Sequence, residues 1–484
     1  MLLKRFYDEP LAQASYLIGC AATGEALVVD PSRDVGQYVR AAEEEGLRVT
    51  HVAETHLHAD FVSGARELAA RTGASLYLSG EGGPDWAYAF ADDAGATLVG
   101  EGDSFAVGNV RVDVLHTPGH TPEHLSFLVT DTAGADRPMG IVTGDFVFVG
   151  DVGRPDLLER AAGWQGTMEA GARTLFHSLQ QFKRLPDYLQ IWPGHGAGSA
   201  CGKALGAVPQ STVGYERMFN WAFGVDDEDE FVRAVLAGQP EPPKYFAEMK
   251  RINRDGPPAL GWQGRPPRLD AARLGELAGG PAVVVDTRPA AAFAAGHVPG
   301  TINIPLARSF ATWAGSLVPY DRDVYLVAGE RGDADIDEAL HELRTIGLDR
   351  VAGYFDQDAV QGWAAAGGRP ATVPQTTPTQ LAADLAAGTV AVVDVRGRAE
   401  WEVGHLPGVP NVPLAQLTDR LAELPRDRPL VVHCQGGTRS AIAASVLQAR
   451  GFTNVVNLTG GFAEWQAGGH PVEEGREGAL QGAR

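Results

Sequence analysis

The sequence predicts an α/β multidomain protein, and three observations support this fold class. The chain has 484 residues, which suggests roughly three domains at about 150 residues each. In the first half, short apolar runs alternate with helical stretches, a pattern typical of layered sheets and helices. The second half contains an internal repeat, and each copy begins with an apolar strand that ends in Asp. Such strands are expected in a parallel sheet with helices on both faces.

The composition argues against several kinds of partner. The formal net charge is -21, and no basic stripe offsets it, so we expect no nucleic acid and no anionic membrane as partners. No apolar run approaches the length needed to span a bilayer, and the N-terminus has no apolar signal core. Cys20, Cys201 and Cys434 are too widely spaced for a disulfide framework or a metal site of the CxxC kind. A reducing, cytoplasmic setting is therefore expected.

Apolar periodicity and helix end signals predict the elements of the first half. An acidic run at 226–230 is expected to cap a helix that starts at Phe231, and a Gly- and Pro-rich segment at 261–268 is expected to be a linker. The expected strands are 26–30, 48–54, 110–115 and 140–145, and the expected helices are 34–45, one that starts at Ser63, 169–182 and 245–253.

The segment 55–61, Thr-His-Leu-His-Ala-Asp-Phe, indicates a metal site. It places three metal-capable side chains, those of His56, His58 and Asp60, at alternating positions directly after a predicted strand. Histidine is the commonest metal ligand, and two of them beside a carboxylate exceed what chance supplies. For a single histidine the alternative is a hydrogen-bonded core residue, which is the interpretation preferred for His51, His116 and His124.

Two later segments complete this site. His120 lies on a Pro-Gly turn after the strand at 110–115, and Asp145 ends the strand at 140–145. Strand ends fix ligands more firmly than flexible loops do. Two histidines and one carboxylate with open positions suit non-heme Fe(II), which activates dioxygen.

With Gly-Arg-Pro-Asp at 153–156 and Pro-Gly-His at 193–195, these motifs resemble the metallo-β-lactamase fold, an αββα sandwich, and within it the persulfide dioxygenases. The resemblance implies one Fe(II) per chain, held by His56, His120 and Asp145. It also implies that His58, Asp60 and His195 orient the ligands or bound oxygen. Arg154 would lie on the substrate side, and a structural ion pair with Asp156 is the alternative.

The same fold family includes binuclear zinc hydrolases such as the glyoxalase II thioesterases. Their motif continues with a histidine where this sequence has Phe61. A two-metal site needs ligands on both sides, so Phe61 favours one metal and the dioxygenase.

A cysteine loop follows the predicted strand at 429–433. Its sequence is Cys-Gln-Gly-Gly-Thr-Arg-Ser at 434–440, and a helix is expected at 441–450. The glycines let backbone N–H groups turn inward as an anion nest. Cys434 at the helix N-terminus, with Arg439 closing the loop, is expected to be a nucleophile. An inert buried cysteine is the alternative, and it leaves the loop composition unexplained.

This loop, with Asp394-Val395-Arg396 and the glycines near 460, strongly resembles the rhodanese active site. The resemblance implies that Cys434 and Arg439 are catalytic. Four residues separate the two, whereas a phosphatase loop carries five, so phosphatase is the weaker alternative. The first repeat has Ala328 in place of the nucleophile, and Glu330 and Asp333 would oppose an anion, so that copy is expected to be inactive. The expected substrate-binding residues of the active loop are Gln435, Gly436, Gly437, Thr438 and Ser440.

The whole order resembles the fused persulfide dioxygenase–sulfurtransferases. The expected domains are a dioxygenase-like domain at 1–260, an inactive rhodanese-like domain at 268–372 and an active one at 376–475. The implied function is Fe(II)- and dioxygen-dependent oxidation of a low-molecular-weight persulfide, such as glutathione persulfide, to sulfite. A Cys434 persulfide would exchange sulfur with thiosulfate, sulfite or a thiol, and the resemblance allows a homo-oligomer. The alternatives are a zinc thioester hydrolase fused to a sulfurtransferase, and a rhodanese pair that senses sulfur or docks a partner.

Overall fold

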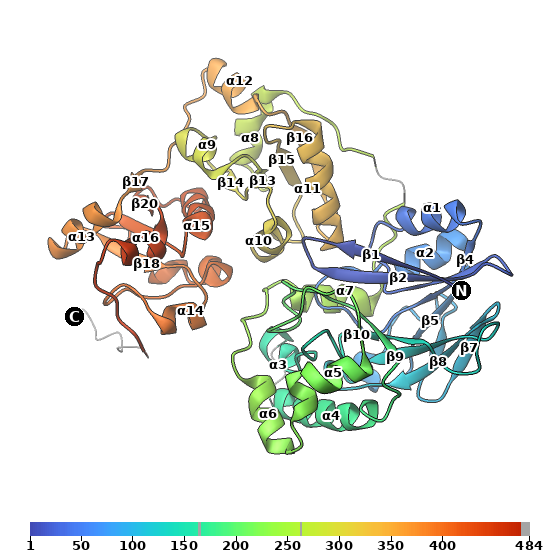
Figure 1. Ribbon diagram of the computed structural model, residues 1–484. Helices are drawn as coiled ribbons and strands as arrows, with labels where there is room; N and C mark the ends of the chain where they lie inside the picture. Colours follow the sequence, from blue (N-terminus) through green and yellow to red (C-terminus); the bar gives the residue numbers. More distant parts are fainter. Residues whose placement is uncertain (163–165, 262–263, 476–484) are drawn as a thin grey trace. The chain divides into compact units, whose positions relative to one another are not determined.

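The computed structural model describes residues 1–162, 166–261 and 264–475 (Figure 1). Trp262 and Gln263, which belong to the linker predicted at 261–268, lie outside the described residues. The chain divides into two compact units, residues 1–262 with 344–347, and residues 263–343 with 348–484. Within the described ranges, no helix is both long and apolar enough to cross a membrane.

The first unit contains two six-stranded sheets. In the first sheet, β1 to β3 are antiparallel and β3 to β6 are parallel. Helices α1 (Gly36–Glu44) and α2 (Ala65–Thr72) follow β3 and β4 in the chain (Figure 1). The strands, in spatial order, are β1 (Leu2–Asp8), β2 (Gln13–Cys20), β3 (Glu25–Val29), β4 (Arg48–Ala53), β5 (Ser75–Ser79) and β6 (Thr97–Val99).

The second sheet is antiparallel except for its parallel pair β10 and β11. Its strands are β7 (Ser104–Val107), β8 (Val110–His116), β9 (Leu125–Asp131), β10 (Gly140–Gly144), β11 (Gln190–Pro193) and β12 (Ser211–Thr212). The helices after β10 are α3 (Leu157–Ala162), α4 (Thr167–Phe182), α5 (Val213–Phe219), α6 (Glu228–Leu236) and α7 (Phe246–Asp255).

Three apolar cores stack in this unit. One lies between α1, α2 and the first sheet, one lies between the two sheets, and one lies between the second sheet and α4 and α6. Every residue of β2 is buried, because the strand has a core on each of its faces. The predicted αββα sandwich is therefore confirmed, and apolar burial on both sides of each sheet stabilises it.

The predicted helix starts in this unit differ from the structure by one to three residues. Helix α6 begins at Glu228 and not at Phe231, because the Asp227 carboxylate accepts a hydrogen bond from the Glu230 N–H at 2.8 Å. The acidic run thus caps the helix from within its first turn, where negative charge suits the dipole. Helix α2 begins at Ala65 and not at Ser63.

The second unit contains two four-stranded sheets, and all their strand pairs are parallel, as predicted. The first module comprises α8 (Leu274–Ala278), β13 (Val283–Asp286), α9 (Ala290–Ala295), β14 (Ile302–Asn303), α10 (Phe310–Leu317), β15 (Val324–Val327), α11 (Asp333–Thr345), β16 (Val351–Phe355) and α12 (Ala359–Ala365). The second comprises β17 (Gln375–Thr376), α13 (Pro378–Ala386), β18 (Ala391–Asp394), α14 (Arg398–Val403), β19 (Leu430–His433), α15 (Thr438–Ala449), β20 (Val455–Leu458) and α16 (Gly461–Ala467).

The two modules repeat one arrangement at the end of their first long strand. Asp286 and Asp394 end β13 and β18, and each accepts hydrogen bonds from the arginine two residues later. The histidines His297 and His405 stack on Phe293 and Trp401 with ring centroids 3.8 and 3.7 Å apart. These contacts stabilise the same part of the fold in both modules.

Helix α15 is buried around its whole circumference over the segment 442–447. One side packs on β19 and β20 of its own module, and it also contacts β14 of the other module. There, the Ser445 hydroxyl accepts a hydrogen bond from the Asn303 N–H at 2.9 Å. A helix that is apolar all round is stable only when it is covered all round, so the first module completes the environment of α15.

Candidate functional sites

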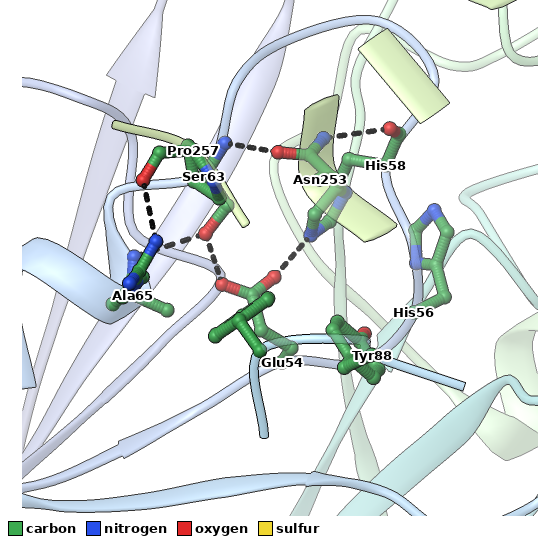
Figure 2. Close-up of a pocket in the computed structure, with 10 residues that line it drawn as sticks. Glu54, His56, His58, Ser63, Ala65, Tyr88, Asn253 and Pro257 are labelled. Carbon is green, nitrogen blue, oxygen red and sulfur yellow. Dashed lines mark hydrogen bonds and ion pairs between the residues drawn. The ribbon is translucent and has the colours of Figure 1, made fainter. Parts of the chain in front are cut away.

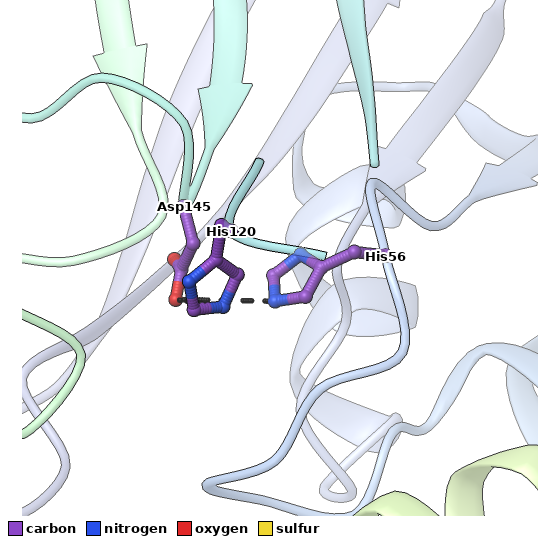
Figure 3. A group of neighbouring side chains, drawn as sticks. All are labelled: His56, His120 and Asp145. Atoms are coloured by element: carbon purple, nitrogen blue, oxygen red, sulfur yellow. Dashed lines mark ion pairs between the residues drawn. The ribbon is translucent and has the colours of Figure 1, made fainter. Parts of the chain in front are cut away.

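Three buried side chains from the ends of three strands converge in the first unit (Figure 3). His56 follows β4, His120 lies between β8 and β9, and Asp145 follows β10. The Asp145 Oδ2 atom lies 3.9 Å from His56 Nε2 and 3.6 Å from His120 Nε2. The three potential ligand atoms lie within 4.8 Å of one another. The structure thus brings together the three residues predicted as metal ligands.

Hydrogen bonds fix the orientation of both imidazole rings. His120 Nδ1 donates to the Arg154 carbonyl oxygen at 3.0 Å. The Thr55 hydroxyl donates to Asp30 Oδ2 at 2.8 Å, so its oxygen is left to accept from His56 Nδ1 at 2.9 Å. In this tautomer each Nε2 lone pair faces the site, as metal-binding histidines require.

The residues present fit a metal ion. His56 Nε2 and Asp145 Oδ2 are buried without a hydrogen-bond partner among the described residues, although buried polar atoms are nearly always paired. Burial lowers the pKa of His56 well below its usual value, which keeps the ring neutral. Burial alone would raise the pKa of Asp145, but the charge and hydrogen bond of His195 hold it well below normal. Two neutral imidazoles and a carboxylate suit a divalent transition metal.

His195 and Asp60 hold Asp145 on the side away from the metal site, at its Oδ1 atom. His195 Nδ1 lies 2.7 Å from Asp145 Oδ1, and His195 Nε2 lies 2.7 Å from Asp60 Oδ2. Burial lowers the pKa of His195, but the two carboxylates outweigh it and raise the pKa to about 10. The imidazolium therefore donates to both carboxylates, which leaves Asp145 Oδ2 directed at the metal site. This placement agrees with an orienting role for both residues.

His58 faces away from the metal ligands. Its Nε2 lies 2.9 Å from Glu54 Oε2 and 3.2 Å from Asp30 Oδ1. Burial lowers the pKa of His58, but these carboxylates outweigh burial and raise it well above normal. Asp30 also binds Thr55, which holds His56. His58 therefore influences His56 in two ways: the ring centroids lie 4.2 Å apart, and the ion pair of His58 with Asp30 holds the carboxylate that binds Thr55.

Two other groups of side chains lie close enough to hold a metal, Asp60–His195–Cys201 and Asp30–Glu54–His58. In each of them a histidine nitrogen already contacts a carboxylate at 2.7 to 2.9 Å. Burial also raises the pKa of Cys201 well above its usual value, which disfavours the thiolate. Among the three groups, the one containing Asp145 is therefore the best metal site.

A pocket reaches His56 and His58 (Figure 2). Tyr88 contributes a hydroxyl that is buried without a partner among the described residues, and the side chain is only 6% exposed. No sequence motif marks Tyr88, so the prediction missed it. The lining residues are Glu54, His56, His58, Ser63, Ala65, Arg66, Tyr88, Phe90, Asn253 and Pro257.

Glu123 is a second residue that the sequence did not reveal. Its carboxylate accepts a hydrogen bond from the Leu57 N–H at 2.8 Å, which fixes the peptide between His56 and His58. Burial raises the pKa of Glu123 to about 7. The only signal in the sequence is a charged residue beside a histidine in an apolar strand start, which is too weak to single it out.

The expected substrate-side role of Arg154 was wrong. Its guanidinium is completely buried and donates to both Asp156 oxygens at 2.8 Å, to the Ala200 carbonyl at 3.0 Å and to the Pro240 carbonyl at 2.6 Å. The structural ion pair with Asp156 is therefore the correct alternative. Arg154 ties the loop before Cys201 to the backbone that orients His120.

The second site lies at the end of β19. Cys434 Sγ accepts a hydrogen bond from the Gly437 N–H at 3.1 Å. The Cys434 and Gln435 carbonyls accept from the Phe462 and Ala463 N–H groups at 2.7 and 3.0 Å. Because a trans peptide directs its C=O and N–H oppositely, the N–H groups that follow these carbonyls face the cradle. The Gly437 N–H thus faces the thiol, as an anion nest requires.

The loop residues differ in their access to solvent. Gln435, Gly436 and Thr438 are exposed and could contact a substrate. Ser440 is fully buried and its hydroxyl donates to the Gly437 carbonyl at 3.0 Å, so its expected contact with substrate was wrong and it braces the loop. Helix α15 begins at Thr438, three residues before the predicted start, since the loop itself forms the first turn.

The corresponding loop of the first module is filled by a carboxylate. Ala328, which replaces the cysteine, is buried. Asp335 accepts hydrogen bonds from the Arg331 N–H at 3.0 Å and from its guanidinium at 2.6 Å. Asp335 therefore binds the Arg331 N–H, the counterpart of the Gly437 N–H that binds Cys434 Sγ in the second module.

Comparison with known proteins gives the family. The model of the metallo-beta-lactamase superfamily matches residues 8–195, and the model of the rhodanese-like domain matches residues 270–362 and 377–468. A solved metallo-beta-lactamase from Staphylococcus aureus subsp. aureus COL is 46% identical, with a TM-score of 0.67, and the match covers 74% of this chain and 99% of that one. The chain belongs to the metallo-beta-lactamase superfamily. It is a fusion of that domain with two rhodanese-like domains.

Two relatives of the metallo-beta-lactamase domain have different names. A hydroxyacylglutathione hydrolase from Rhodospirillum rubrum is 31% identical over 252 residues, which are 49% of this chain and 80% of the relative. A mitochondrial persulfide dioxygenase, ETHE1, from Mus musculus is 28% identical over 239 residues, again 49% of this chain and 80% of the relative. The relatives therefore leave the choice between hydrolase and dioxygenase to the site itself.

Proposed function

We propose that the protein is a persulfide dioxygenase that uses one Fe(II) and transfers sulfur through Cys434. The substrate would be a low-molecular-weight persulfide such as glutathione persulfide, oxidised by dioxygen to sulfite. The observation that carries this proposal is the set His56, His120 and Asp145, whose free ligand atoms face one another in a buried site. Two histidines and a carboxylate leave open coordination positions for dioxygen and a sulfur ligand.

The side chains around the site have separate tasks. Bound iron would supply the redox chemistry and hold the reactants at its open positions. Arg154 and Thr55 orient the two imidazoles through Nδ1, and His195 holds one oxygen of Asp145. The Tyr88 hydroxyl would donate a hydrogen bond to a substrate in the pocket beside His56. These fixed groups keep the reactants positioned and exclude competing water.

At the second site the Cys434 thiolate would attack the outer sulfur of a donor. With a thiol persulfide, the new bond joins Cys434 Sγ to that sulfur, the S–S bond of the donor breaks, and a thiolate leaves. Thiosulfate would react in the same way and release sulfite. The Gly437 N–H beside Cys434 Sγ and the adjacent inward-facing N–H groups would stabilise the negative sulfur.

A zinc thioester hydrolase is the second candidate, favoured by the 31% identity to the hydroxyacylglutathione hydrolase. The structure of the second metal position argues against it. Phe61 is completely buried there, with its ring centroid 4.4 Å from that of His58. His58 Nε2 contacts the carboxylates of Glu54 and Asp30, and Asp60 Oδ2 contacts His195.

Metal analysis and oxygen uptake test the first proposal. We expect about one iron per chain and oxygen consumption with glutathione persulfide. The Asp145→Asn variant should lose both, because the amide cannot supply an anionic oxygen to the metal. If iron-loaded protein consumes no oxygen but zinc-loaded protein hydrolyses a hydroxyacylglutathione, the dioxygenase proposal is wrong.

The Cys434→Ser variant tests the second site. It should lose sulfur transfer from thiosulfate or persulfide to a thiol and should keep its oxygen uptake. Sulfur transfer that survives this change would show that Cys434 is not the carrier.

A further inference from the structure

Arg439 does not face the Cys434 cradle as a free cation. Its guanidinium makes a two-pronged ion pair with Glu400 of α14, with one contact at 2.8 Å and a shorter one from Nη1. Glu400 also accepts a hydrogen bond from the Gly397 N–H at 3.3 Å, so two partners hold its carboxylate in place. Such bidentate pairs are geometrically specific.

The other arginine of this region is neutralised as well. Arg396 donates to the Gln435 side chain at 3.2 Å, which places it beside the loop. It is also bound to Asp394, with contacts of 2.7 to 3.1 Å. Each of these two arginines is thus matched by one carboxylate, and the two pairs together carry no net charge.

Burial raises the pKa of Glu400, but the hydrogen bond and charge of Arg439 outweigh burial and lower the pKa below its usual value. The carboxylate is therefore ionised at neutral pH. A donor that approaches Cys434 meets backbone N–H groups and a neutral ion pair, and no unbalanced positive charge comes from Arg439.

We propose that Glu400 sets the donor preference of Cys434, favouring thiol persulfides over thiosulfate. This inference rests on the proposed sulfur-transfer function. A deprotonated persulfide carries one negative charge at its reacting end, whereas thiosulfate carries two. Both donors give the same enzyme product: Cys434 Sγ bonds to the outer sulfur, the S–S bond of the donor breaks with its electron pair, and a thiolate or sulfite leaves.

The second charge of thiosulfate makes it more sensitive to Glu400. In general, two unit charges about 6 Å apart in a medium of effective dielectric constant about 40 interact by an energy that changes a rate about tenfold. Salt screens part of this effect, because about 8 Å is the Debye length at physiological ionic strength. Removing the Glu400 charge should therefore increase the rate at which thiosulfate reacts with Cys434 by about fivefold to tenfold more than it increases the rate of the persulfide reaction.

The experiment compares single-turnover formation of the Cys434 persulfide in the full-length protein, without oxygen, with glutathione persulfide or thiosulfate as donor. Mass spectrometry of the Cys434 peptide gives the two rates. Glu400→Gln removes the charge, and glutamine can still bond to the helix N-terminus. Glu402→Gln is the matched control, because Glu402 lies on the same helix but pairs with Arg398 at 3.0 Å.

We expect Glu400→Gln to shift the thiosulfate-to-persulfide rate ratio about fivefold to tenfold towards thiosulfate, and Glu402→Gln to leave it unchanged. Glu400→Ala, checked by its unfolding temperature, replaces Glu400→Gln if that variant does not fold. An unchanged ratio, or an equal shift in Glu402→Gln, would overturn the inference while sulfur transfer itself stands. If neither donor modifies Cys434 in the unaltered protein, the proposed sulfur-transfer function fails first.

Discussion

Gly461, the first residue of α16, lies directly behind the cysteine loop, and its replacement by alanine tests how that loop is held. Its φ angle is +57°, a region that costs a residue with a side chain about 1–2 kcal/mol. A Cβ atom there would lie 2.8 Å from the Gln435 carbonyl oxygen and closer still to that of Cys434. Both neighbours are backbone atoms, so the loop itself must move.

The magnitude follows from these contacts. Relief requires a shift of about 1 Å in the loop, and misplacement on this scale can reduce a rate by about 10²-fold. The shift also weakens the hydrogen bonds from Phe462 and Ala463 to the loop carbonyls, each of which contributes about 1 kcal/mol. We therefore expect Gly461→Ala to lose about 3 kcal/mol of stability in its domain and most of its sulfur transfer.

Gly460→Ala is the matched control. Its φ angle is +67°, so the backbone cost is the same. The three atoms nearest to the added Cβ all belong to the Glu464 side chain, which can rotate away. Denaturant unfolding and single-turnover sulfur transfer separate the two variants. If Gly461→Ala transfers sulfur as fast as Gly460→Ala, the loop is not held by α16 in the way described.

Three further changes have expected outcomes. Tyr88→Phe removes a buried hydroxyl that has no partner among the described residues, so the free energy of unfolding should stay equal or rise by about 1 kcal/mol. The KM for persulfide in oxygen uptake should rise. An unchanged KM would show that Tyr88 does not contact the substrate. In a Cys434→Ser background, adding Ala328→Cys alone should give no sulfur transfer, because Asp335 fills that loop. Adding both Ala328→Cys and Asp335→Ala to the same background should give more sulfur transfer. Activity with Ala328→Cys alone would contradict this explanation. Burial raises the pKa of Glu123 from 4.5 to about 7, so the folded state binds more protons than the unfolded state and the free energy of unfolding should fall between about pH 4.5 and 7. Glu123→Gln should remove roughly 3 kcal/mol of that fall, as measured by denaturant titrations at pH 5 and 8. An unaltered pH profile would refute the assignment.

The sequence predicted the fold well because its signals are local. The apolar strands at 282–286 and 391–394 predicted parallel sheets, and the segment 55–61 predicted the turn after β4. The prediction that His120 and Asp145 would join His56 came from the motifs after strand ends together with the family resemblance, because the strands that carry them belong to two different sheets. These inferences depend on periodicity and short motifs, both of which survive without knowledge of packing.

The parts that were missed depend on long-range packing. Asp30, which binds Thr55 and His58, has a φ angle of +52°, and nothing in its neighbourhood in the chain reveals either feature. Arg154 was misjudged for the same reason: its carbonyl partners at Ala200 and Pro240 lie far along the chain. The sequence alone does not distinguish an arginine that binds a substrate from one that binds carbonyl groups of its own chain.

The apolar circumference of α15 constrains how this protein can be shortened. Deleting the first rhodanese-like module would remove β14 and the Asn303 N–H that binds Ser445. The outer side of α15 would then become surface, and the helix carries the cysteine loop at its N-terminal end. The first rhodanese-like module, which has Ala328 at the position of Cys434, thus covers the outer side of α15. The second module would need a redesigned helix face to be stable alone.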